Sequence, residues 1–228
     1  MRKNAIRITT VLAGLATALS SAACGIDANP SMVIKAFHGL KVDTDGCTYS
    51  DAAVVGGTFD AGLSAVGGGA YSVYARIDNL MPGNENLDEG RQNTTFVQLT
   101  SVDVKYANTD AWAFLPSGKT LPAGFVMESS SENYVPINPI DPQTAKLMLE
   151  GKDGVPSPIA EPGSCADLLL TVQARGIMGD GSDIESNEID FPVTVCNTAV
   201  GCPAGTQLGD ACTLVQPDGF KCEAADAP

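Results

Sequence analysis

The most reactive side chains in this sequence belong to seven cysteines and a single histidine. The cysteines are Cys24, Cys47, Cys165, Cys196, Cys202, Cys212 and Cys222. An exported chain is not expected to leave an odd thiol exposed, so one cysteine needs another role. If Cys24 has that role, the other six can form three disulfides in an oxidising compartment. No two cysteines form a CxxC pair, which argues against metal binding by thiolates.

The residues before Cys24 have the features of an export signal. Arg2, Lys3 and Arg7 are positive, and an uncharged, mostly apolar run follows from Ile8 to Ala18. Small residues then precede the cysteine, as a signal peptidase requires. The run is shorter than the roughly 20 apolar residues of a stable transmembrane helix. We therefore interpret residues 1–23 as a signal peptide and residues 24–31 as a short tether.

The segment Ser21-Ala22-Ala23-Cys24 resembles the lipobox of Gram-negative envelope lipoproteins, although Ser21 stands where those proteins usually have Leu. The resemblance implies that Cys24 is acylated, with palmitate among the acyl chains, and that this lipid attaches the protein to a membrane. Gly25 after the cysteine fits the pattern that accompanies sorting to the outer membrane in such proteins. Cleavage near Ala22 or Ala23, which would leave Cys24 for a disulfide, is the alternative.

The charge balance restricts the partners of the mature chain. The sequence has 13 basic and 27 acidic residues. Loss of residues 1–23 leaves 10 basic against 27 acidic residues, a net charge of −17. Such a surface repels nucleic acid and anionic headgroups, so neither is an expected partner. Solubility explains this charge most simply, and binding of a divalent cation or a basic ligand is the alternative.

Strand-like segments separated by Gly, Pro, Asn and Asp dominate the rest of the chain. We predict strands at 32–37, 52–59, 70–77, 94–106, 112–115 and 124–127, the last two as a hairpin around a turn at 116–119. Asp141 and Pro142 favour the start of a short helix that continues over 144–150.

The clearest pattern is a half-buried hairpin made by 168–176 and 188–195. Pairing residues whose numbers sum to 361 places apolar side chains opposite one another, including Leu170 with Phe191. The same register pairs Cys165 with Cys196 within disulfide range. We therefore predict this disulfide, with a bridge from Cys47 to either residue as the rival.

These elements predict an all-β fold, an antiparallel β-sandwich of immunoglobulin or fibronectin type over residues 32–197. Trp112 does not match the cysteine spacing of a true immunoglobulin domain. Residues 198–228 are poor in large apolar side chains, so they cannot fold without the support of disulfide bonds. We expect a Cys-rich tail there, with Cys47 bonded to Cys202, Cys212 or Cys222.

No catalytic constellation is present, so we expect a non-enzymatic protein of binding or structural type, without a cofactor, that recognises a protein or a glycan. The alternative is a secreted carbohydrate-active or other hydrolase that uses carboxylates. The expected binding surface is the loop after the third strand, with Asp78, Asn84, Glu85, Asp88 and Glu89.

A second acidic loop lies between the two strands of the hairpin. It supplies Asp180, Asp183 and Glu185, whose oxygens suit a weak calcium site. Ordinary solvated loop residues are the alternative. The lone His38 follows the first predicted strand, where we expect a structural or exposed role.

Overall fold

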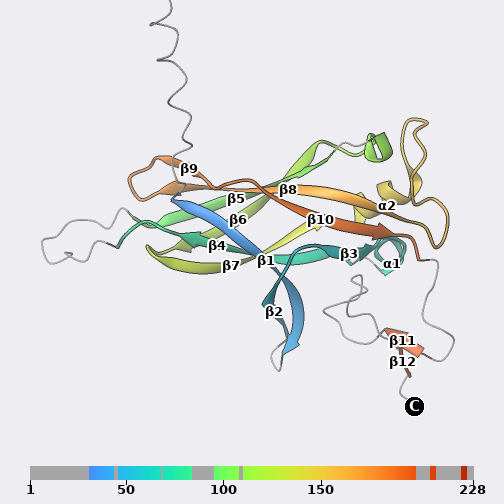
Figure 1. Cartoon of the computed structure of the whole chain (residues 1–228), viewed down its shortest axis with the longest axis horizontal. Coiled ribbons are helices and arrows are strands. Elements are labelled where there is room, and N and C mark those ends of the chain that lie inside the picture. Colours follow the sequence, from blue (N-terminus) through green and yellow to red (C-terminus); the bar gives the residue numbers. More distant parts are fainter. Residues whose placement is uncertain are drawn as a thin grey trace, which may run out of the picture. The chain divides into compact units, whose positions relative to one another are not determined.

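A computed structural model describes residues 31–43, 46–67, 69–83, 95–107, 110–198, 206–208 and 222–224. The described part is mostly β-strand, with two large sheets and two short helices (Figure 1). The prediction of a β-rich chain with two sheets is therefore confirmed. Among the described residues, no helix has the length and apolar character needed to cross a membrane.

The first large sheet has four antiparallel strands. Their order is β2 (Gly46–Val54), β1 (Met32–Asp43), β4 (Tyr71–Asn79) and β7 (Ser131–Ile140). Strand β7 was not predicted, because Pro136 and Pro139 interrupt its apolar pattern. Both prolines are tolerated because β7 is an edge strand, where a backbone N–H is dispensable.

The second large sheet contains the long strands of the C-terminal half. Its order is β3 (Gly57–Asp60), β10 (Ile189–Cys196), β8 (Cys165–Met178), β5 (Val97–Tyr106) and β6 (Gly118–Met127), and β9 (Asp183–Glu185) also pairs with β8. Strands β3 and β10 are parallel, a pairing that the predicted antiparallel fold does not include, whereas the other strand pairs of this sheet are antiparallel as predicted. The reason is local: the chain leaves β2 at Val54 and crosses within two residues to the edge of the other sheet.

The predicted hairpin between β8 and β10 is confirmed with its register. Ile189 pairs with Val172 and Phe191 pairs with Leu170, as the index sum of 361 requires. The disulfide is confirmed as well: Cys165 and Cys196 are bonded, with Cα atoms 4.1 Å apart.

The predicted hairpin of 112–115 with 124–127 is wrong. Trp112 ends a 3-10 turn (Asp110–Trp112), and its buried indole Nε1 donates to the carbonyl oxygen of Asp167 at 2.8 Å. Strand β6 begins at Gly118 and pairs with β5 instead. Because Trp112, Phe114 and Leu115 are all buried, a cluster of apolar residues in a turn was mistaken for a strand.

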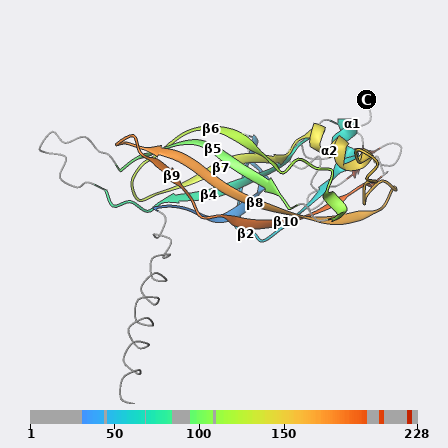
Figure 2. The ribbon, with the colours of Figure 1, turned by 90° about the horizontal axis from the view of Figure 1, so that it is seen from above.

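The two helices illustrate how local sequence does and does not predict structure. Helix α2 (Pro142–Glu150) is confirmed, with Asp141 as N-cap accepting a hydrogen bond from Thr144 N–H. Helix α1 (Ala61–Gly67) was not predicted, because its seven residues include only one large apolar side chain before Val66. Both helices lie at one end of the large sheets, and β9 lies at the other end (Figures 1 and 2).

The core lies between the two large sheets. Phe37 of β1 and Phe191 of β10 approach to 4.7 Å between ring centroids, and both belong to one buried apolar cluster. The Tyr106 hydroxyl of β5 donates to the carbonyl oxygen of Pro139 in β7 at 2.6 Å, which links the sheets by a buried hydrogen bond. Alternating buried and exposed residues along β5 and β8 give each strand one core face.

In the predicted tail, β11 (Thr206–Leu208) and β12 (Cys222–Ala224) form an antiparallel pair. Cys24, Cys202 and Cys212 lie outside the described residues, as do the predicted signal peptide and most of the tether. The structure describes Cys47 and Cys222 only by their place in β2 and β12, so the other predicted disulfides remain predictions.

Candidate functional site

The predicted acidic binding loop divides into two parts. Asp78 belongs to β4 and is 6% exposed, and the Nε of Arg76 donates to its carboxylate at 3.2 Å. Asp78 therefore stabilises the sheet, contrary to its predicted place in a loop. Asn84, Glu85, Asp88 and Glu89 lie outside the described residues.

The three residues of the predicted calcium loop make separate interactions. Asp180 accepts hydrogen bonds from the N–H and the hydroxyl of Ser182, and these bonds lower the pKa of its carboxyl group. The carboxylate of Glu185 binds the guanidinium of Arg175, and exposed Asp183 pairs through its strand with Ile177. Within the ranges that the structure describes, no group of three or more His, Cys, Asp or Glu side chains is placed to hold a metal ion.

An open cavity of about 470 Å³ lies beside helix α2. It is lined by Tyr106, Pro116, Lys119, Asp141, Gln143, Thr144, Lys146, Leu147 and Glu150. Burial acts to raise the pKa of Asp141, but the hydrogen bond from Thr144 N–H and the ion pair with Lys119 outweigh it, so the net pKa is lowered. Asp141 is thus held ionised at neutral pH and is poorly suited to donate a proton there.

Four rings gather on the outer face of the first sheet, and we call them the tyrosine cluster: His38 of β1, Tyr49 of β2, Tyr74 of β4 and Tyr134 of β7. Tyr49 stacks on Tyr134 with centroids 3.8 Å apart, and the ring centroids of Tyr49 and Tyr74 are 5.7 Å apart with the planes inclined at 63°. The His38 ring is edge-on to Tyr134 at 5.0 Å. The three tyrosines are each partly exposed, so their rings are accessible from solvent.

His38 lies beneath these rings and has one polar atom without a partner. It is 4% exposed, and its Nδ1 lies 2.8 Å from the carbonyl oxygen of Ser50. A carbonyl only accepts, so Nδ1 of His38 carries a proton and donates it to this oxygen. Among the described residues, Nε2 is the buried side-chain nitrogen or oxygen atom that has no hydrogen bond. Leaving such a buried atom without a partner costs about 1–3 kcal/mol of stability.

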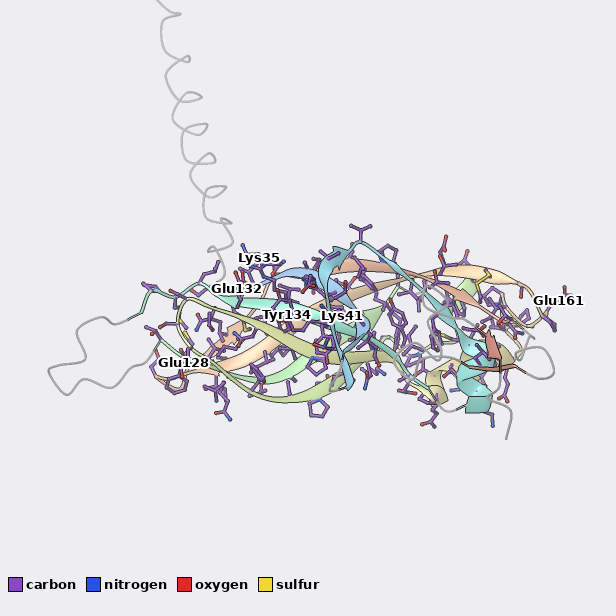
Figure 3. All side chains as sticks on the ribbon, turned by 90° about the horizontal axis from the view of Figure 1, so that it is seen from below. Lys35, Lys41, Glu128, Glu132, Tyr134 and Glu161 are labelled. Atoms are coloured by element: carbon purple, nitrogen blue, oxygen red, sulfur yellow. A yellow bond between two sulfur atoms is a disulfide. The ribbon has the colours of Figure 1, made fainter. Side chains whose placement is uncertain are left out.

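Polar side chains surround the tyrosine cluster and compensate one another. Arg76 binds both Asp78 and Glu132, the latter at 2.6 Å, and Lys41 binds Asp51 at 2.8 Å. Figure 3 shows one group of labelled residues far from Glu161, which lies at the opposite end. The group consists of Lys35, Lys41, Glu132 and Tyr134. This surface therefore combines aromatic rings with ion pairs.

Sequence reasoning missed the tyrosine cluster, although one sign of it was present. Tyr74 alternates with the apolar residues of its strand, which places it with Ser72 and Arg76 on the outer face. The partners Tyr49 and Tyr134 come from strands 25 residues before and 60 residues after it, as the numbering shows, so only the sheet order brings them together.

No model of a known protein family matches the chain, and the search of curated proteins found no significant match.

Proposed function

We propose that this chain is an exported protein of the Gram-negative cell envelope, anchored to the outer membrane by acyl chains on Cys24, whose β-domain binds a partner and performs no chemistry. The observation that carries the proposal is the disulfide between Cys165 and Cys196. Structural disulfides form and persist in oxidising compartments such as the periplasm, and they are rare in the cytosol.

The disulfide also supports the assignment of Cys24 as the lipidated residue. It uses two of the seven cysteines and leaves Cys47, Cys202, Cys212 and Cys222 to form two further pairs. An acylated Cys24 then accounts for the odd thiol.

We propose further that the two facing sheets form a β-sandwich of immunoglobulin or fibronectin type. The contact between Phe37 and Phe191 and the single core between the sheets support this type. Sandwiches of this kind present loops and outer faces on a rigid scaffold, where recognition residues are commonly placed.

Recognition rather than catalysis is supported by the surface of the first sheet. Tyrosines are enriched at binding surfaces because a rigid, amphipathic ring gives a large contact area at a low cost in side-chain entropy. In the cavity beside α2, Asp141 is held ionised by its hydrogen bonds and by Lys119, which favours a binding role for its carboxylate.

The test is mass spectrometry of the mature N-terminus after expression of the full chain in a Gram-negative host. We expect the mature protein to begin at Cys24 with a diacylglycerol thioether and an N-acyl chain, and to partition into the detergent phase of Triton X-114. Cys24→Ala is the matched control and should partition into the aqueous phase. An unmodified mature terminus would refute the anchor.

A further inference from the structure

We propose that the end of the β-domain from which the tether leaves is a membrane-contacting surface, which rests by apolar contact on the zwitterionic phospholipid bilayer that holds the acyl anchor. We call it the anchor end and define it by Leu80, Phe125, Val126 and Ile177. This inference rests on the lipid anchor of the proposed function and adds the orientation in which the anchored domain is held.

The backbone places the start of the domain at this end. Leu80, directly after β4, donates its N–H to the carbonyl oxygen of Ser31, the last residue of the tether, at 2.7 Å. The side chain of Asn79 donates to the carbonyl oxygens of Thr95 and Met127, at 2.9 and 3.3 Å, and so joins the ends of the two large sheets. Both sheets therefore end together next to the tether, opposite helices α1 and α2 (Figure 1).

Exposed apolar side chains concentrate at the anchor end. In the part of the chain that the structure describes, seven large apolar side chains are exposed, and four of them are those that define this end. The exposed fraction is 57% for Val126 and 38–45% for the other three. Val126 and Ile177 flank Gln98 on the outer face of the second sheet, since both pair with it. Single exposed apolar residues are ordinary on a protein surface, so their concentration beside the tether is the informative feature.

The length of the tether decides which partner this end meets. Ser31 is seven residues after Cys24, and a fully extended chain of this length reaches roughly 25 Å. An anchored domain therefore keeps the anchor end close to the bilayer. Even a weak apolar contact forms under this condition, because the tether gives the two surfaces a high effective concentration.

The charge around the anchor end selects the kind of bilayer. The acidic residues there are Glu128, Asp180, Asp183 and, in the segment 84–94 that joins β4 to β5, Glu85, Asp88 and Glu89. The basic residues are Lys35, Arg91, Arg76 and Arg175, and each of the last two binds two carboxylates. Acidic charge is in excess, so anionic headgroups are repelled. The surface complements headgroups without net charge, through its apolar side chains.

A protein partner is the rival occupant, because exposed apolar groups also mark protein interfaces. The bilayer is favoured because the tether brings it to this end in every anchored molecule, whereas a protein has to bind from solution.

The test uses the single tryptophan of the chain. Trp112 is fully buried, so its fluorescence is a constant background. Val126→Trp adds an indole at the anchor end. Leu169→Trp, the matched control, adds one on the same outer face, eight residues before Ile177 in β8 and thus roughly 26 Å away. The acylated full chain with each substitution is reconstituted into vesicles of phosphatidylcholine brominated on its acyl chains, since bromine quenches indole fluorescence on contact.

The bilayer should quench only the indole at the anchor end. We expect the added fluorescence of Val126→Trp to fall about twofold, because an indole settles at the depth of the headgroups, and that of Leu169→Trp to stay unchanged. With Val126→Trp present, Leu80→Ser should weaken the quenching, whereas Val155→Ser, five residues after α2, should not. Vesicles of brominated phosphatidylglycerol, which is anionic, should quench less than phosphatidylcholine.

Three outcomes would overturn the inference. They are equal quenching of Val126→Trp and Leu169→Trp, no quenching of either, and stronger quenching by phosphatidylglycerol, which would show an electrostatic contact instead of an apolar one. Absence of quenching would leave a protein as the occupant of the anchor end.

A second arm separates this surface from the lipid anchor. Cys24→Ala with a hexahistidine tag at the mature N-terminus is held on phosphatidylcholine vesicles by a nickel-chelating lipid, and the same difference between Val126→Trp and Leu169→Trp is expected. An unmodified Cys24 with quenching in this arm would refute the anchor and support the surface. An acylated Cys24 without quenching would refute the surface and leave the anchor intact.

Discussion

Tyr49 and Tyr134 stack face to face, with their centroids 3.8 Å apart and their planes 3° from parallel, although they belong to opposite edge strands of one sheet. Two intervening strands would separate these side chains in a regular sheet. The pairing of β1 has register shifts, at Ile34/Ala36 with β4 and at His38/Leu40 with β2, and such irregularities commonly bend a strand and increase its twist. The stack therefore joins the β1–β2 hairpin to β7 by a direct side-chain contact.

A double-mutant cycle measures this contact. We expect Tyr49→Ala and Tyr134→Ala each to lower the free energy of unfolding, with a coupling energy of about 0.5–1.5 kcal/mol, as for other aromatic pairs. Urea unfolding followed by circular dichroism gives the four values. Tyr134→Phe retains the ring and should keep most of the stability. Strictly additive effects would show that the rings do not interact in solution.

The disulfide prediction concerns the end of the β8–β10 hairpin. Cys165 and Cys196 are 31 residues apart in sequence. Replacing both by Ala should lower the free energy of unfolding by roughly 3–4 kcal/mol, because the unfolded chain regains the freedom of an open loop of this length. The measurement is urea unfolding of the oxidised parent and the double variant. Peptide mapping under non-reducing conditions is the companion experiment, and a fragment joining Cys47 to Cys165 would contradict the structure.

Two glycines of β6 give a matched pair. A Cβ added to Gly118 would lie 2.3 Å from the carbonyl oxygen of Val104, whereas one added to Gly124 meets no atom within 4 Å. Gly118→Ala should therefore push β5 and β6 apart and destabilise the protein by about 1–3 kcal/mol. Gly124→Ala should be neutral, or should raise stability by up to about 1 kcal/mol, because it restricts the unfolded chain. Thermal unfolding of both variants tests this. An equal loss of stability in the two variants would refute the close approach of Gly118 to the backbone of Val104.

Tyr106 gives a prediction for alkaline pH. Burial raises the pKa of its hydroxyl from 10.0 to about 12. Since the folded pKa exceeds the unfolded value, the neutral form stabilises the fold fully below pH 10, and this contribution is lost as the pH rises towards 12. We expect the unfolding free energy of the parent to fall in this window more steeply than that of Tyr106→Phe. Urea midpoints between pH 8 and 12 measure the difference, and parallel curves would contradict the assigned pKa.

At neutral pH the same variant reports on the link between the sheets. Tyr106→Phe removes the hydrogen bond to the carbonyl oxygen of Pro139 while keeping the ring. Because Pro139 is buried and its carbonyl would lose this partner, we expect a loss of about 1–3 kcal/mol at pH 7.

The sequence by itself determined the features that depend on local pattern. Alternation over 168–176 and 188–195 was enough to define the register of β8 with β10, because a shift of one residue would move every apolar side chain to solvent. The cysteine pair followed from that register. Asp141 before Pro142 was enough to place the start of α2, because capping is a contact between residues three apart.

Only the tertiary structure decided the features that depend on distant segments. Trp112 and its neighbours have the apolar composition of a buried strand, although they lie in a turn. Their burial there depends on contact with β8, where the Trp112 indole donates a hydrogen bond to the carbonyl oxygen of Asp167. The parallel pairing of β3 with β10 depends on where the chain crosses between sheets. The tyrosine cluster is the clearest case, since its rings come from four strands and no spacing in the sequence indicates that Tyr49 stacks on Tyr134.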